Sequence, residues 1–232
     1  MWSRSLDLVF AKVADLFSLI FGSTCPVCGR IATKLCLDCS ETLETRQWDQ
    51  SLGEYHGDVI AAFVYDSTIR QAILGFKYRN QRSSLRFLGD AVVRRVLVEQ
   101  SRSLKKIDIV TWAPTTQSRI TERGYDHAEL IARYIAKKLR VRCLKLLTRT
   151  SDQPQTGKSR ESRLIGPIFW ARKLNAEHVL VFDDVVTTGA TLNSASLALY
   201  QAGAGLVSCV AIASTVLWRS STESCALAKA RK

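Results

Sequence analysis

The sequence predicts an α/β protein with a mostly parallel sheet, because apolar, β-branched segments alternate with helical ones. The predicted strands span residues 58–65, 107–112, 141–147, 178–182 and 206–214. The predicted helices span residues 67–76, 85–98, 126–139 and 190–201. Alternating strands and helices form βαβ units, whose ligands bind beyond the carboxyl ends of the strands. The segments after Trp112 and Phe182 are therefore the first places to look for a site.

Composition supports a folded protein with an anionic partner. The chain has 232 residues, of which 47% are hydrophobic, and a formal net charge of +12. This composition excludes a disordered tail, and the lack of a long uncharged apolar run excludes a polytopic membrane protein. The charge favours phosphorylated metabolites, nucleic acid or an acidic membrane surface as partners, and solubility alone is the alternative.

The first 21 residues predict an amphipathic helix rather than a signal peptide. Apolar residues recur at helical spacing, while Asp7, Lys12 and Asp15 interrupt the apolar run that a signal peptide needs. We expect this helix to pack on its own domain. Binding of the helix to a membrane surface is the alternative, although its polar face is not rich in Lys and Arg.

Residues 22–45 predict a zinc knuckle. Two Cys-x2-Cys pairs, Cys25/Cys28 and Cys36/Cys39, are separated by a seven-residue spacer. Four thiolates complete a tetrahedral site that leaves no position for substrate, so the expected Zn²⁺ is structural. Two redox pairs or simply buried thiols are the alternatives. The odd number of cysteines argues against a secreted disulfide framework and favours a reducing compartment.

The segment from Val179 to Leu192 predicts a phosphate loop. An apolar strand leads to Asp183 and Asp184, and a turn rich in hydroxyl groups then leads into a helix. A helix N-terminus offers free N–H groups and a positive dipole end to a phosphate, and sugar hydroxyls or a divalent metal suit the two carboxylates. The ligand implied is a phosphorylated sugar, and an ordinary capped turn is the alternative. The loop residues are Val186, Thr187, Thr188, Gly189, Ala190 and Thr191.

The same stretch, VLVFDDVVTTGAT, resembles the phosphoribosyl pyrophosphate (PRPP) motif of the type I phosphoribosyltransferases. Further segments are similar to the ComF competence family: Ala113-Pro114, Arg119 and the run from Arg123 to Ala128, then Gln155, Arg163 and Phe169. The four-cysteine knuckle belongs to the same family pattern. The resemblance covers roughly residues 6–215 and implies a type I phosphoribosyltransferase fold over residues 55–218. Residues 219–232 are polar, and we expect them to form a tail.

The resemblance also assigns roles to residues. Asp183 and Asp184 would hold the ribose, with Mg²⁺ bridging ribose and pyrophosphate, and residues 186–191 would bind the 5′-phosphate. The pyrophosphate loop would be Ala113, Pro114, Arg119 and Arg123, and a flexible loop over residues 150–163 would carry Gln155, Lys158, Arg160 and Arg163. Lys77 lies in a further basic segment. Asp126 departs from the family pattern, and it either adds a negative charge near the pyrophosphate or caps the following helix.

Two functions follow from these features. The first is a phosphoribosyltransferase that binds PRPP and Mg²⁺ and transfers the phosphoribosyl group to an acceptor with release of pyrophosphate. The sequence does not identify this acceptor. The alternative, implied by the ComF resemblance, is a non-catalytic DNA-uptake factor that binds single-stranded DNA or a helicase-like partner. The resemblance places such a protein in the cytoplasm at the inner membrane, without membrane insertion.

Overall fold

The computed structural model describes residues 25, 27–32, 35–45, 59–78, 82–103, 105–150 and 167–215. Its main sheet has five strands in the order β1-β7-β6-β2-β3, and every neighbouring pair is parallel. The strands are β1 (Val59–Val64), β2 (Ile109–Trp112), β3 (Arg142–Cys143), β6 (His178–Val186) and β7 (Leu206–Ser214). The predicted α/β class is confirmed.

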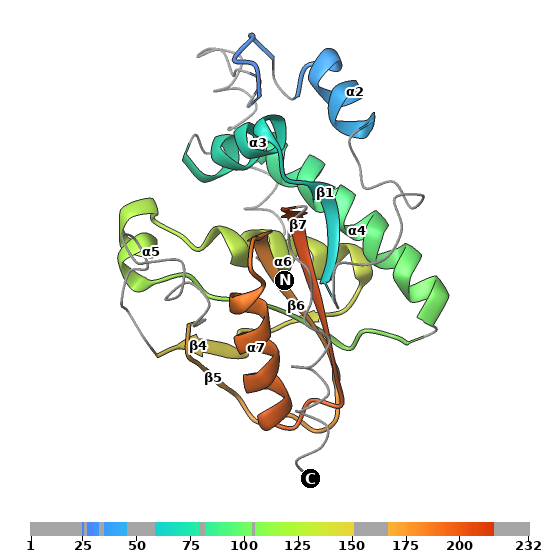
Figure 1. The fold of residues 1–232 in the computed structure, drawn as a ribbon, viewed down its shortest axis with the longest axis vertical. Coiled ribbons are helices and arrows are strands. Elements are labelled where there is room, and N and C mark those ends of the chain that lie inside the picture. The colour runs from blue at the N-terminus through green and yellow to red at the C-terminus, as the bar shows by residue number, and fades with distance from the viewer. Residues whose placement is uncertain are drawn as a thin grey trace, which may run out of the picture.

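Helices cover both faces of this sheet (Figure 1). They are α2 (Leu37–Thr45), α3 (Ser67–Tyr78), α4 (Arg82–Ser103), α5 (Gln117–Arg123), α6 (His127–Leu139) and α7 (Ala190–Gln201). The helices α3, α4 and α6 share one core with Leu180 and Phe182 of β6, whereas α7 shares the other with Val179 and Val181. Because successive strand residues face opposite cores, a strand buried on both faces is apolar without alternation.

A second, antiparallel ribbon lies beside α7. It pairs β4 (Leu147–Arg149) with β5 (Phe169–Ala171). The predicted strand over residues 141–147 is thus wrong as one element, because the chain leaves the main sheet after β3 and turns Leu146 and Leu147 into the α7 core. The helix α5 and the strand β5 were not predicted.

The strand β6 is longer than predicted and includes both acidic residues. It runs to Val186 rather than Phe182, since Val185 and Val186 still pair with β7. The predicted phosphate turn is therefore only three residues long, from Thr187 to Gly189. Such a short turn joins the last residue of β6 almost directly to the first turn of α7.

The cysteine segment and α2 sit above α3 in Figure 1, at the end toward which β7 points. Leu43 of α2 is fully buried in the same core as Phe63 and Ile69, and Val27 and Leu35 pack against that core. The knuckle therefore shares the hydrophobic core of the α/β domain.

Several sequence predictions fall outside the described residues. These are the helix over residues 1–21, most of the flexible loop over residues 150–163 and the tail over residues 219–232. Within the described part of the chain, no helix is both long enough and apolar enough to cross a membrane.

Candidate functional site

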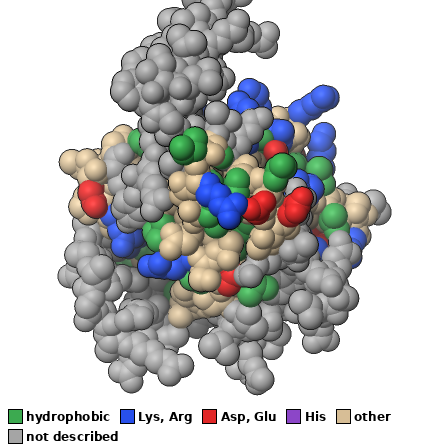
Figure 2. Space-filling view, turned by 90° about the horizontal axis from the view of Figure 1, so that it is seen from above, with side chains coloured by type: hydrophobic (Ala, Val, Ile, Leu, Met, Phe, Trp, Pro, Cys, Tyr) green, Lys and Arg blue, Asp and Glu red, His purple; other side chains and the backbone are tan. Residues whose placement is uncertain are grey.

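Charged side chains from distant parts of the sequence meet at the carboxyl edge of the sheet. Lys77, in the last turn of α3, forms an ion pair with Asp184 Oδ2 near the end of β6. These side chains are only 20% and 26% exposed. Figure 2 shows the outer surface at this end of the molecule, on which Lys or Arg side chains lie next to Asp or Glu side chains. A half-buried pair is screened less by water than a surface pair.

The two carboxylates of β6 are oriented by the backbone that follows them. Asp183 Oδ1 accepts a hydrogen bond from the Asp184 N–H at 2.8 Å, and Asp184 Oδ1 accepts one from the Val185 N–H at 2.7 Å. Each carboxylate therefore keeps its second oxygen for another partner. In Asp184 that oxygen holds Lys77.

The environment of Asp183 raises its pKa to about 7. Burial is the main cause, because it disfavours the charged carboxylate, and the negative charge of Asp126 adds to it. The positive charges of Lys77 and Arg149 act in the opposite direction. Such a carboxyl group takes up or loses a proton near neutral pH, which is typical of functional sites.

Arg149, at the end of β4, was not recognised from the sequence as a site residue. Its charge lowers the pKa of Asp183, so the ribbon brings a cation toward the end of β6. The only available signal was its position immediately before the basic loop predicted for residues 150–163. At this end of the ribbon, Thr150 donates its N–H to Ile168 O at 3.0 Å.

The turn after β6 is the segment predicted to bind a phosphate, and it joins the strand to α7 through a left-handed glycine. Gly189 adopts a left-handed conformation (φ 74°) and caps α7, a position that a side chain would strain. The Ala190 N–H donates to Thr188 Oγ1 at 3.4 Å, and the Thr187 carbonyl accepts from Thr215 Oγ1 at 3.4 Å. The first turn of α7 directs its N–H groups toward the same end of the sheet as the carboxylates.

The predicted pyrophosphate loop follows β2 at the same edge. Ala113 and Pro114 are buried directly after the strand, and α5 then carries Arg119 on an exposed face. Arg123 ends α5, but its side chain is outside the described part of the structure. Lys158, Arg160, Arg163 and Gln155 of the predicted flexible loop also fall outside the described residues.

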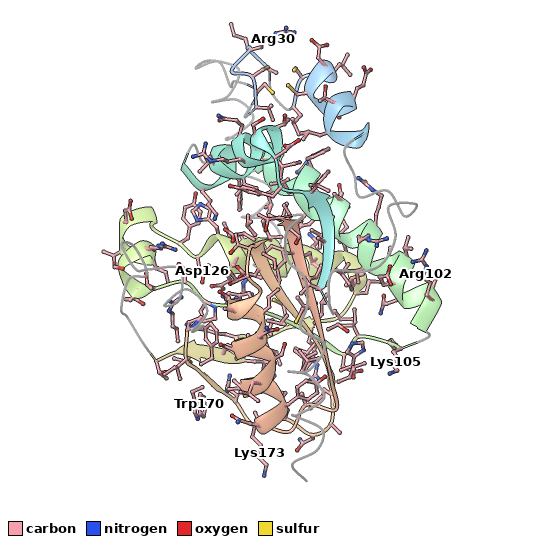
Figure 3. The ribbon with its side chains drawn as sticks, viewed as in Figure 1. Arg30, Arg102, Lys105, Asp126, Trp170 and Lys173 are labelled. Carbon is pink, nitrogen blue, oxygen red and sulfur yellow. The ribbon has the colours of Figure 1, made fainter. Side chains whose placement is uncertain are left out.

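Asp126 caps the helix α6, which confirms one of the two interpretations drawn from the sequence. It is buried and accepts hydrogen bonds from the Ala128 N–H (3.0 Å), Trp112 Nε1 (3.2 Å) and the Thr115 N–H (3.3 Å). Burial raises the pKa of Asp126 despite these donors. The negative charge of Asp126 also raises the pKa of Asp183. The other interpretation, which places this charge near a bound pyrophosphate, stays a prediction. Figure 3 shows Asp126 inside the molecule, near the carboxyl ends of the strands.

The four cysteines of the knuckle form a cluster that could hold a metal ion. The sulfur atoms of Cys25, Cys28, Cys36 and Cys39 all lie within 4.8 Å of one another, with Cys28 and Cys36 Sγ 3.6 Å apart. Zinc–thiolate bonds of about 2.3 Å in a tetrahedron place sulfur atoms about 3.8 Å apart. The cluster therefore has the size of a closed Zn²⁺ site.

The thiols of this cluster are unequal before any metal binds. Burial acts to raise the pKa of Cys25, but hydrogen bonds from the backbone of Cys28, Cys36 and Val27 outweigh it and lower that pKa to about 6. Burial and the neighbouring thiols raise the pKa of Cys39. The low pKa of Cys25 provides one thiolate to begin metal binding. A bound cation then favours loss of the protons from the other three thiols.

Two curated proteins are similar to the chain over most of its length. Competence protein ComFC of Bacillus subtilis (strain 168) is 27% identical over 195 residues, which cover 79% of this chain and 74% of the relative. Competence protein ComFC of Streptococcus pneumoniae (strain ATCC BAA-255 / R6) is 26% identical over 198 residues, covering 81% of this chain and 79% of that protein. The predicted ComF resemblance is confirmed by these relatives. No protein-family profile matches the chain.

Among solved structures, an adenine phosphoribosyltransferase from Saccharomyces cerevisiae is similar to the chain at 18% sequence identity. The match has a TM-score of 0.42 and covers 77% of this chain and 90% of that enzyme.

Proposed function

We propose that the protein binds PRPP with Mg²⁺ at the carboxyl edge of the sheet and transfers the phosphoribosyl group to an acceptor, releasing pyrophosphate. One observation carries this proposal. The strand β6 ends in the acidic pair Asp183-Asp184, and a three-residue turn with a left-handed Gly189 then starts α7. Carboxylates for a sugar and an anion site for its phosphate thus lie on one short segment.

The 5′-phosphate would bind at the turn from Thr187 to Gly189. Backbone N–H groups and the dipole at the start of α7 attract a phosphate, and the hydroxyl groups of Thr188 and Thr191 add donors. No carboxylate lies inside the turn itself, because the acidic pair belongs to the strand. The phosphate would therefore be spared direct repulsion.

The acidic pair suits both the ribose and the metal. Mg²⁺ in phosphate-binding sites is held by one or two carboxylates together with substrate phosphates, and Asp183 and Asp184 supply that number. When bound, Mg²⁺ would neutralise charge on the diphosphate leaving group. The carboxylates would hold the ribose hydroxyls and stabilise positive charge that develops on the sugar.

Cations around the pair would serve the leaving group. Lys77 and Arg149 act on Asp183 from two different elements, and Arg119 is exposed on α5 at the same edge. Positive groups held beside a departing diphosphate stabilise the charge that it gains. Arg123 and the basic residues of the loop over 150–163 would add to this set.

Calorimetry with PRPP and Mg²⁺ tests the proposal with two variants. Thr188→Val removes a hydroxyl donor and should weaken both PRPP and ribose 5-phosphate by roughly 1–3 kcal/mol. Asp184→Asn should weaken PRPP and spare sulfate, because it removes a charge that only the ribosyl ligand and metal need. Thr42→Val, whose hydroxyl donates to Asp38 O on the knuckle, is the matched control and should bind as wild type does.

Failure of the wild type to bind PRPP would overturn the proposal, as would wild-type PRPP binding by Asp184→Asn. Turnover is a separate measurement. A panel of nucleobases and amines, assayed for PRPP consumption and pyrophosphate release, would identify the acceptor.

A role in DNA uptake is the second candidate. The relatives are named competence proteins, and the net charge of +12 suits a polyanion. Binding through Lys and Arg should weaken steeply as salt rises. A titration of single-stranded DNA that shows no shift at low salt and micromolar protein would remove this candidate.

A further inference from the structure

The ion pair between Lys77 and Asp184 places an ammonium group where the proposed function requires a metal. Asp184 uses Oδ1 to accept the Val185 N–H, and its other oxygen, Oδ2, binds Lys77 Nζ. A cation that approaches this carboxylate therefore meets a charge that is already in place. Lys77 comes from α3, on a different segment from β6, so the pair can open without any change in the strand.

Both partners are withdrawn from water, which makes the pair more than a surface contact. Their side chains are 20% and 26% exposed, whereas the Arg30–Asp38 pair on the knuckle is 69% and 70% exposed. An exposed pair contributes little, but a carboxylate that is mostly buried needs a counter-charge. Lys77 supplies that counter-charge to Asp184 and also acts on Asp183.

We propose that Lys77 is an internal substitute for the divalent cation at Asp184, and that it leaves the carboxylate only when a sugar diphosphate offers it a new anionic partner. The inference rests on the proposed function for its ligand. It extends the proposed function, because it makes one lysine determine when the metal can bind. Lys77 acts here as a positioning residue, through its competition for Asp184.

The exchange makes metal and sugar diphosphate bind cooperatively. Metal alone must displace Lys77 and leave its ammonium group beside a second cation, which is unfavourable. With a diphosphate present, the released Lys77 pairs with phosphate oxygens while the metal takes Asp184. Coupling of this kind is reciprocal, so each ligand should tighten the other by the same factor.

The binding of Mn²⁺ without PRPP tests directly whether Lys77 takes the place of the metal. It is measured through the electron paramagnetic resonance signal of the free ion. We expect Lys77→Met to bind Mn²⁺ about tenfold tighter than wild type, equivalent to about 1.4 kcal/mol. The matched control is Lys105→Met, which removes one exposed positive charge before the amino end of β2, at the opposite edge of the sheet (Figure 3). Its affinity for Mn²⁺ should stay within twofold of wild type.

Two further variants secure the assignment. Asp184→Asn in the Lys77→Met background should lose the added affinity, which shows that the ion binds at Asp184. Lys77→Gln removes the charge but can still hydrogen-bond Asp184, and it replaces Lys77→Met if that variant fails to fold. In the presence of PRPP, the neutral variants should show a smaller gain in Mn²⁺ affinity than wild type.

Tighter Mn²⁺ binding by Lys77→Met or Lys77→Gln supports the proposal that Lys77 takes the place of the metal. Affinity no greater than that of Lys105→Met, including no detectable binding in any variant, overturns it. The proposed function fails by a different result, the absence of PRPP binding to wild type. Mn²⁺ binding alone does not depend on that result.

Discussion

The cysteine knuckle and the carboxyl edge of the sheet are both polar centres, but they are assembled differently. The knuckle draws four like groups from one short segment, Cys25 to Cys39. The sheet edge draws groups of opposite charge from α3, β4 and β6, with Lys77, Arg149 and the acidic pair as its members. One centre has four ligands that need a cation, and the other already contains its own counter-charges.

Under the proposed function, this difference separates a centre that supports the fold from a centre that exchanges partners. The four thiols are crowded into one cluster of the size of a closed metal site, so a bound metal would hold them together as a structural element. At the sheet edge, the ion pair between Lys77 and Asp184 satisfies the carboxylate without any ligand. A site that is stable when empty can bind and release a substrate, whereas a closed metal site cannot.

The largest effect should come from breaking the knuckle. We expect the purified protein to carry about one zinc ion per chain, because four thiolates complete the coordination. Cys28→Ser should lose this metal and lower the free energy of unfolding by about 4 kcal/mol or more. Elemental analysis and urea unfolding measure the two effects. The loss should spread into the α/β domain, because Leu43 places α2 in its core.

Cys143→Ser is the matched control for this prediction. Cys143 is a half-buried cysteine outside the cluster, on β3. It should keep the metal and most of the stability. Fresh wild-type protein with less than half an equivalent of zinc would contradict the comparison, since the knuckle would then hold its shape without a metal.

The contact between knuckle and domain gives the next largest effect. Leu43→Ala empties a fully buried position and should cost about 2–5 kcal/mol. Leu37→Ala, on the same helix but 79% exposed, should change stability by less than about 0.5 kcal/mol. Chemical unfolding of both variants checks the difference. Equal effects would mean that α2 does not contribute its buried face to the core.

The same contrast explains what could be predicted from the sequence. The four cysteines were recognised because their spacing is local, and a local spacing fixes which thiols can meet. The join between β6 and α7 was also recognised, since a strand, an acidic pair and a hydroxyl-rich turn follow one another directly. The end of β6 was misplaced by four residues, because acidic residues usually mark a strand end and here they continue to pair with β7.

Contacts between distant segments could not be predicted. Lys77 belonged to one basic stretch among several, and nothing in its neighbours indicates that α3 brings it to Asp184. Arg149 carried still less signal, because its strand pairs with β5 in a ribbon that was not predicted. The double role of Asp126 also depends on the fold, which buries it beside Trp112 and within electrostatic reach of Asp183.

A smaller effect on stability, confined to a defined pH range, is expected at Asp183. In the folded protein the pKa of Asp183 is about 7, whereas in an unfolded chain it lies near the ordinary value of 3.8. Between these two pH values the folded protein keeps a proton that the unfolded chain has lost. Wild type therefore loses stability as the pH rises from about 4 to 7, because the unfolded state releases the proton first. Asp183→Asn cannot titrate, so its stability relative to wild type should rise over this window by about 1–3 kcal/mol and then level off.

Urea unfolding of metal-free protein between pH 4.5 and pH 8 measures that difference. A stability difference that does not change with pH would contradict the buried-carboxylate interpretation. A gain in stability combined with weaker PRPP binding would show that the sheet edge sacrifices stability for its function, as active sites often do. The knuckle should show the opposite behaviour, because every substitution of its ligands should destabilise the fold.

The smallest effect should come from Asp126, which tests whether the sheet edge acts as one electrostatic unit. Its negative charge raises the pKa of Asp183, so Asp126→Asn should lower that pKa by less than about one unit. The amide can still accept the Ala128 N–H, but its NH₂ group would face the donors of Trp112 and Thr115, at a cost of about 1 kcal/mol. Carbon NMR titration of the Asp183 carboxyl group measures the shift. Glu122→Gln removes a negative charge from an exposed position on α5, and the titration of Asp183 should not respond to it. An equal response to both variants would leave Asp126 as a helix cap alone, and Asp183 would then owe its raised pKa to burial without help from its neighbour.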